Sequence, residues 1–252
     1  MSGLLSVENV VVRFGGVTAV NDVSFELARG SSTGLIGPNG AGKSTLLAAL
    51  SGSVRIAGGT IHLDGRRLGH LGPARRCHLG MVRTHQTPRP FPGLTVRENL
   101  LAGERYGRNR AGVSAAEILT LTGLSPQADM LVSRLSPSDL RKLEMARALA
   151  TGPSLLLLDE VAAGIPEDEI DDLAAMLRSI VASGVALLMV EHVLRVVTQV
   201  VDRLLVLDEG RLLGAGAPAE VLRRDEVREA YLGPLGDENF DLRRGGSHAD
   251  SE

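Results

Sequence analysis

The chain has 252 residues, of which 44% are hydrophobic, and a formal net charge of −3, which suits one large domain or one domain with a subdomain. Its acids and bases are interspersed, so the charge gives no reason to expect a nucleic-acid partner. The single cysteine, Cys77, excludes an internal disulfide, and the longest apolar runs are too short to cross a bilayer, so any membrane contact has to go through a partner.

The first third of the chain predicts strands with one helix between them. Segments rich in β-forming residues and bounded by turns predict strands over Val7–Arg13, Val23–Leu27, Thr33–Ile36 and Thr60–Leu63. A helix pattern before the last of these strands puts apolar side chains on one face, at Leu46, Leu47 and Leu50. A cluster of arginines follows and favours a solvated face, at Arg66, Arg67, Arg75 and Arg76.

The middle of the chain has a different character. Strand signals are few between about residues 87 and 152, and helix patterns cover Val96–Ala102, Ala115–Thr122 and Ser138–Ala150. We interpret this stretch as a helical subdomain that is inserted between strands.

Strands and helices alternate in the last third of the chain. Short apolar strands are predicted at Leu155–Leu158, Val185–Val190 and Leu204–Leu207, separated by helix patterns at Asp168–Val181 and Val193–Val200. This alternation predicts an α/β fold with a mostly parallel sheet that is covered on both faces. Residues 236–252 are rich in Gly, Ser and charged residues and predict a disordered tail, so the domain is expected to span residues 1–235.

A phosphate-binding loop is the strongest local motif. The pattern G-x-x-x-x-G-K-[ST] follows an apolar strand and opens a helix, as the motif requires. Glycines let several backbone N–H groups point at one anion, and the helix N-terminus adds the positive end of its dipole. Lys43 can place a cation on the β- and γ-phosphates, and the Ser44 hydroxyl can ligate Mg²⁺. The predicted nucleotide-binding residues are Gly37, Pro38, Asn39, Gly40, Ala41, Gly42, Lys43, Ser44 and Thr45.

Polar residues follow two of the apolar strands. Asp159 and Glu160 end the run of four leucines from Leu155, and Glu191 and His192 follow Val185–Val190. Carboxylates at the carboxyl ends of parallel strands face the ligand crevice. Asp159 can hold the Mg²⁺ shell, and Glu160 can polarise a water for attack on the γ-phosphate. The alternatives are a solvated strand end for the two acids and a helix start without chemistry for His192.

Together these motifs resemble the nucleotide-binding subunit of ABC transporters, over nearly the whole chain to about Gly233. The resemblance implies a P-loop NTPase core with an N-terminal antiparallel β subdomain and ATP and Mg²⁺ as cofactors. It assigns adenine stacking to Phe14, for which a core phenylalanine is the alternative, and the switch histidine to His192. It makes Gln86 the glutamine that touches Mg²⁺ and the attacking water. The implied catalytic residues are then Glu160, His192 and Gln86, and the implied metal ligands are Ser44, Gln86 and Asp159.

The family's signature sequence is altered in this chain. Leu135-Ser136-Pro137-Ser138-Asp139 stands where the family has Leu-Ser-Gly-Gly-Gln, and the resemblance implies that Ser136 and Ser138 contact the ATP of a second subunit. Pro137 has no N–H to give, and Asp139 brings a negative charge close to a polyphosphate. The helix start itself is sound, because Ser136 suits the N-cap and Asp139 the acid position of a capping box. We therefore expect a normal helix with a weakened contact to ATP, and hypothesise a heterodimer with one strong and one weak site.

Several segments resemble the branched-chain amino acid importer group within this family. They are the ten residues from Phe14 to Val23, Arg83-Thr-His-Gln, the nine residues from Phe91 to Asn99, Val161-Ala-Ala-Gly and Glu229-Ala-Tyr-Leu-Gly233. The resemblance implies an ATPase that couples hydrolysis to amino-acid uptake, bound through transmembrane permease subunits to the cytoplasmic face of the cell membrane. It also implies a second ABC ATPase subunit, as a homodimer or a heterodimer. The alternative is a nucleotide-binding, weakly hydrolysing regulatory half of a heterodimer.

Overall fold

The computed structural model describes residues 3–84, 89–107 and 113–232. Within these ranges the strands are β1 (Leu5–Phe14), β2 (Val17–Leu27), β3 (Ser32–Ile36), β4 (Gly58–Leu63), β5 (Arg66–Arg67), β6 (Met81–Arg83), β7 (Leu155–Asp159), β8 (Ala186–Val190), β9 (Arg203–Asp208) and β10 (Arg211–Gly216). The α-helices are α1 (Lys43–Ser51), α2 (Pro73–His78), α3 (Val96–Tyr106), α4 (Ala115–Leu121), α5 (Pro137–Ala150), α6 (Ile170–Ala182), α7 (Leu194–Val200), α8 (Pro218–Val221) and α9 (Asp225–Leu232).

A six-stranded sheet in the order β10-β9-β3-β8-β7-β6 forms the centre of the molecule. Neighbouring strands from β9 to β6 run parallel, and β10 is added antiparallel to β9 at one edge. Every residue of β3, β7 and β8 is buried, as expected for parallel strands that are covered on both faces. The predicted α/β fold with a mostly parallel sheet is confirmed.

Side chains of β7 alternate between two hydrophobic clusters. Leu156 and Leu158 pack in the cluster that contains apolar residues of α3 to α7. Leu155 and Leu157 pack in the cluster that contains α1 and the N-terminal strands. Because successive strand residues point to opposite faces, one run of leucines supplies both cores and leaves Asp159 at the end of the strand.

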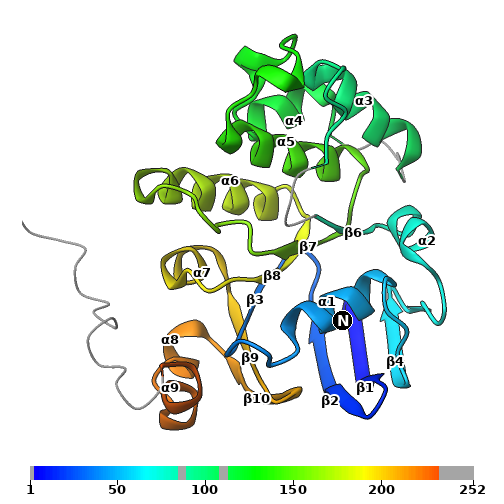
Figure 1. The fold of residues 1–252 in the computed structure, drawn as a ribbon, viewed down its shortest axis with the longest axis vertical. Helices are drawn as coiled ribbons and strands as arrows, with labels where there is room; N and C mark the ends of the chain where they lie inside the picture. The colour runs from blue at the N-terminus through cyan, green and yellow to red at the C-terminus, as the bar shows by residue number, and fades with distance from the viewer. Residues whose placement is uncertain (1–2, 85–88, 108–112, 233–252) are drawn as a thin grey trace, which may run out of the picture.

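The N-terminal strands form a separate four-stranded sheet in the order β2-β1-β4-β5, with antiparallel pairing throughout. The β4–β5 turn uses Asp64 at φ 53° and Gly65 at φ 73°, the left-handed conformation that a tight hairpin requires. An antiparallel N-terminal β subdomain is therefore present, beside α1 and the central sheet (Figure 1).

Three helices, α3, α4 and α5, gather at one end of the molecule beyond the central sheet (Figure 1). Helices α3 and α4 each begin with a full capping box, formed by Thr95 with Glu98 and by Ser114 with Glu117. These three helices lie within the stretch that was interpreted as an inserted subdomain, and they are called the helical subdomain below. None of the helices in the described ranges is long and apolar enough to cross a membrane.

The structure corrects two expectations. The predicted helix Asp168–Val181 begins as α6 only at Ile170, because residues Glu167–Glu169 wind as a 3₁₀ turn. Arg76 is not on a solvated face, since it is only 3% exposed and donates hydrogen bonds to the carbonyl oxygens of Ala49 and Leu50 at the end of α1. The last carbonyls of a helix have no partner within the helix, and Arg76 supplies one. The predicted tail lies outside the described residues.

Candidate functional site

The predicted phosphate loop connects β3 to α1. Gly37 has φ 151° and Gly42 has φ 99°. A Cβ on Gly37 would come within 1.9 Å of the Leu207 oxygen, and a Cβ on Gly42 would come within 2.3 Å of the Ala19 oxygen. Only glycine fits at these two positions, so the loop backbone is free to curl around an anion. The Lys43 Nζ folds over the loop and donates to the carbonyl oxygens of Gly37 and Pro38 at 2.7 Å each.

Acidic residues at the end of β7 face this loop. Burial lowers the pKa of the Lys43 ammonium, and the nearby carboxylates of Glu160 and Asp159 raise it in part. The Ser44 Oγ donates to Asp159 Oδ1 at 3.4 Å, so a hydroxyl and a carboxylate oxygen lie next to each other. Both are hard oxygen donors of the kind that Mg²⁺ prefers beside a polyphosphate, and the residues present therefore fit a magnesium–nucleotide complex.

Arg83 is a site residue that the sequence analysis missed. Its Nη2 pairs with Asp159 Oδ2 at 2.6 Å, opposite the oxygen that faces Ser44. The guanidinium sits on the edge strand β6 and neutralises a carboxylate whose side chain is only 8% exposed. The motif around Arg83 was used for the family resemblance alone, because nothing local in the sequence indicates a partner 76 residues away.

Glu160 and His192 follow β7 and β8, which are neighbours in the sheet. Glu160 has a left-handed backbone conformation at φ 51°, and its N–H donates to the Val190 oxygen at 2.9 Å. His192 is exposed and lies two residues beyond Val190. The buried residue between them, Glu191, accepts a hydrogen bond on Oε1 from the Ala162 N–H at 2.8 Å. The structure thus brings the ends of β7 and β8 together at one edge of the sheet.

The predicted signature residues start α5, on the other side of a cavity of about 570 Å³. Ser136 is the N-cap, and its Oγ accepts from the Asp139 N–H at 3.1 Å and donates to the Asp139 carboxylate at 2.9 Å. The full capping box expected here does not form, because Asp139 meets the hydroxyl of Ser136 and not its backbone N–H. Ser138 Oγ donates to Glu169 Oε2 at 2.5 Å, which ties α5 to the start of α6.

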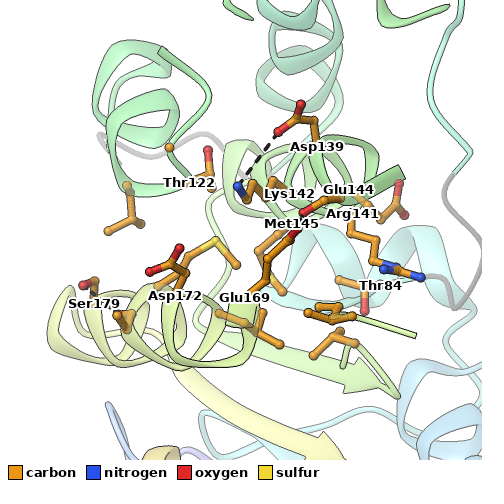
Figure 2. A pocket seen from close by; sticks show the side chains of 18 of the residues that line it. Thr84, Thr122, Asp139, Arg141, Lys142, Glu144, Met145, Glu169, Asp172 and Ser179 are labelled. Carbon is orange, nitrogen blue, oxygen red and sulfur yellow. Dashed lines mark hydrogen bonds and ion pairs between the residues drawn. The ribbon is translucent and has the colours of Figure 1, made fainter. Parts of the chain in front are cut away.

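Figure 2 shows side chains that line this cavity, which lies between α5, α6 and the end of β7. Asp139, Lys142 and Met145 approach it from α5, and Asp172 and Ser179 approach it from α6. Asp159, Glu160 and Thr84 also line it, whereas the residues of the phosphate loop do not. Ser136 and Ser138 therefore share a cavity with Glu160 but not with Lys43 of the same chain.

Two further residues, Phe14 and Gln86, were predicted to belong to the site. Phe14 ends β1 and is 51% exposed, so its ring is open for stacking and the alternative of a core phenylalanine is wrong. Gln86 lies outside the described residues. Among the described residues, the candidate site therefore consists of the phosphate loop, the ends of β7 and β8, and the start of α5.

The chain is similar to proteins of one family. The ABC transporter family pattern matches residues 20–163. The high-affinity branched-chain amino acid transport ATP-binding protein LivG of Salmonella typhimurium is 38% identical over 251 residues, which cover 91% of this chain and 98% of the relative. The corresponding protein BraF of Pseudomonas aeruginosa is 33% identical over 249 residues, with 91% and 98% covered.

A solved structure agrees with these relatives. The crystal structure of the ADP conformation of MJ1267, an ATP-binding cassette of an ABC transporter, matches with a TM-score of 0.82 and 32% identity over 92% of this chain and 100% of that chain. None of these comparisons supports the alternative of a weakly hydrolysing regulatory half.

Proposed function

Since the chain belongs to the ABC transporter family, we propose that it powers the uptake of branched-chain or related amino acids through transmembrane permease subunits. The chain is an ATPase of the ABC type and binds ATP and ADP. The choice of solute is supported by two relatives, similar over 91% of this chain, that are named as branched-chain amino acid transport ATP-binding proteins.

One observation carries the catalytic part of the proposal: Lys43, Ser44, Asp159 and Glu160 converge where β3 and β7 end. Lys43 binds the β- and γ-phosphates above the glycine loop. Ser44 and Asp159, with Gln86, hold Mg²⁺, which when bound neutralises the charge that develops on the phosphates. Glu160 accepts a proton from the attacking water as a general base.

The remaining site residues orient the nucleotide. Phe14, half exposed at the end of β1, stacks on the adenine ring. His192, exposed beyond β8, donates a hydrogen bond to the γ-phosphate. Ser136 and Ser138 face the ATP of a second ABC ATPase subunit, because their own cavity does not include the phosphate loop of the same chain.

Contact with the permease is assigned to the helical subdomain and the loops beside it. Most of the exposed large apolar side chains in the described ranges lie there, at Phe91, Leu94, Leu101, Val113, Met130 and Leu131. Exposed apolar side chains that gather on one part of a surface mark a partner site. Docking there holds the ATPase at the cytoplasmic face of the cell membrane.

Uptake into vesicles tests the proposal. The chain is reconstituted with transmembrane permease subunits and a second ABC ATPase subunit, and ATP-dependent uptake of labelled leucine is measured. We expect uptake that is saturable, that isoleucine and valine compete with, and that a Lys43→Ala variant abolishes. Uptake that none of the branched-chain amino acids inhibits would overturn the solute class, while a full rate in Lys43→Ala would overturn the site.

A further inference from the structure

The turn that carries Glu160 is strained. Glu160 has φ 51°, in the left-handed region that residues with a Cβ adopt only at an energetic cost. Such a conformation persists only where the surrounding structure holds it. Glu160 is also the proposed general base. The contacts that hold its backbone in this conformation therefore also set the position of its carboxylate.

Two hydrogen bonds tie this turn to the end of β8. The Glu160 N–H donates to the Val190 oxygen at 2.9 Å, which continues the pairing of the two strands. Two residues on, the Ala162 N–H donates to Glu191 Oε1 at 2.8 Å. The turn also closes on itself through a hydrogen bond from the Ala163 N–H to the Glu160 oxygen at 3.2 Å. The side chain of Glu191 is therefore one of the two anchors.

A glutamate is unexpected at the buried position that Glu191 occupies. It is 1% exposed, and a buried carboxyl group is costly unless hydrogen bonds satisfy it. Its second oxygen, Oε2, has no hydrogen-bond partner among the described residues. Burial raises the pKa of Glu191, and the hydrogen bond from the Ala162 N–H lowers it in part. An apolar side chain of the same size would fill this space at less cost, so packing does not explain the carboxyl group.

We propose that Glu191 is a positioning residue, whose Oε1 clamps the Ala162 N–H and thereby holds Glu160 in the left-handed conformation that aims its carboxylate at the attacking water. The inference rests on the proposed role of Glu160 as general base. Glu191 itself is buried and does not line the cavity that Asp159 and Glu160 line. Because the clamp needs only an acceptor oxygen, a glutamine at the same position supplies it equally well.

Two variants of nearly equal volume separate the clamp from simple packing. Glu191→Gln keeps an oxygen for the Ala162 N–H, whereas Glu191→Met fills the same space without an acceptor. We expect kcat of the methionine variant to fall by about 10–100-fold, as for other groups that orient a catalytic residue, while the glutamine variant stays near the wild type. Affinity for a non-hydrolysable ATP analogue should be the same in all three proteins, because Lys43 and its loop follow a different strand.

Amide hydrogen exchange gives a second readout that does not depend on turnover. The Ala162 N–H should exchange faster in Glu191→Met than in the wild type, and at the wild-type rate in Glu191→Gln. Wild-type kcat and wild-type exchange in the methionine variant would overturn the clamp, and so would a glutamine variant as slow as the methionine one.

The clamp and the proposed function can fail separately. If Glu160→Gln retains turnover, Glu160 is not the base, and the proposed role falls. Exchange at Ala162 still reports whether Glu191 holds the turn. A melting temperature for each variant shows that the protein is folded where the rates are compared.

Discussion

The buried Arg76 provides the sharpest test of how the fold supports the site. Its guanidinium donates to the carbonyl oxygens of Leu71, Ala49, Leu50 and Gly69 at 2.8, 2.8, 2.5 and 3.1 Å. Two of these acceptors are in the last turn of α1, the helix that begins with Lys43. Arg76 thus fixes the far end of the helix whose first residue, Lys43, is proposed to bind phosphate.

Replacing Arg76 by methionine keeps the bulk of the side chain and removes all four donors. A hydrogen bond contributes about 1 kcal/mol net, and a carbonyl left buried without a donor costs about 1–3 kcal/mol. Methionine also relieves the cost of burying a charge, which offsets part of the loss. We expect the free energy of unfolding to fall by about 2–4 kcal/mol, with Leu50 as the α1 carbonyl most affected, because the Ala49 oxygen keeps the Gly52 N–H as a donor at 3.2 Å.

Urea denaturation followed by circular dichroism measures this loss. The matched control is Arg75→Met, since Arg75 is the preceding residue of α2 and is exposed; its unfolding free energy should change by less than about 0.5 kcal/mol. Equal urea midpoints for the two variants would refute the reasoning. They would mean that the hydrogen bonds of buried Arg76 contribute no more to the free energy of unfolding than exposed Arg75 does.

Three further outcomes are expected. Phe14→Ala should cost about 1–3 kcal/mol of ATP affinity in a calorimetric titration, the usual value of a stacked base; an unchanged affinity would remove Phe14 from the site. Burial raises the pKa of Glu191 above its ordinary 4.5, so its contribution to stability is complete below that pH and is lost as the pH rises through the raised pKa. In a pH series of urea midpoints, Glu191→Gln should therefore gain stability relative to the wild type with rising pH, and a constant difference would contradict this. Changing Pro137 and Ser138 to glycine and Asp139 to glutamine together should raise the ATPase rate of the isolated chain by about tenfold or more, since the change restores N–H donors and removes a repelling charge; equal rates would refute the hypothesis of a weak site.

Local sequence predicts the phosphate loop and the central strands because their signals are contained in a few adjacent residues. The run Leu155–Leu158 is apolar at every position, so it predicts a buried strand without knowledge of its neighbours. The pattern from Gly37 to Ser44 requires its loop geometry within eight residues. The short strands β6 and β10 were not predicted, since three residues, or six that include two glycines, carry little strand signal.

The residues that sequence analysis missed act through distant partners. Arg83 meets Asp159 across 76 positions, Glu191 meets Ala162 across 29, and Arg76 meets Ala49 across 27. Each of them looks like an ordinary charged residue until the fold brings its partner close. Ser138 is similar, because its bond to Glu169 appears only when α5 packs beside the start of α6.

Glu160→Gln tests the central claim of an ATPase centred on the ends of β3 and β7. The amide keeps the shape of the side chain and loses the basic oxygen, while Lys43, Ser44 and Asp159 are untouched. ATP binding by calorimetry and phosphate release at saturating ATP and Mg²⁺ are measured on the same preparations. We predict wild-type ATP affinity, turnover reduced by about 10²–10⁴-fold, and accumulation of an ATP-bound dimer. Turnover close to that of the wild type would contradict the account, because the base would then be another group.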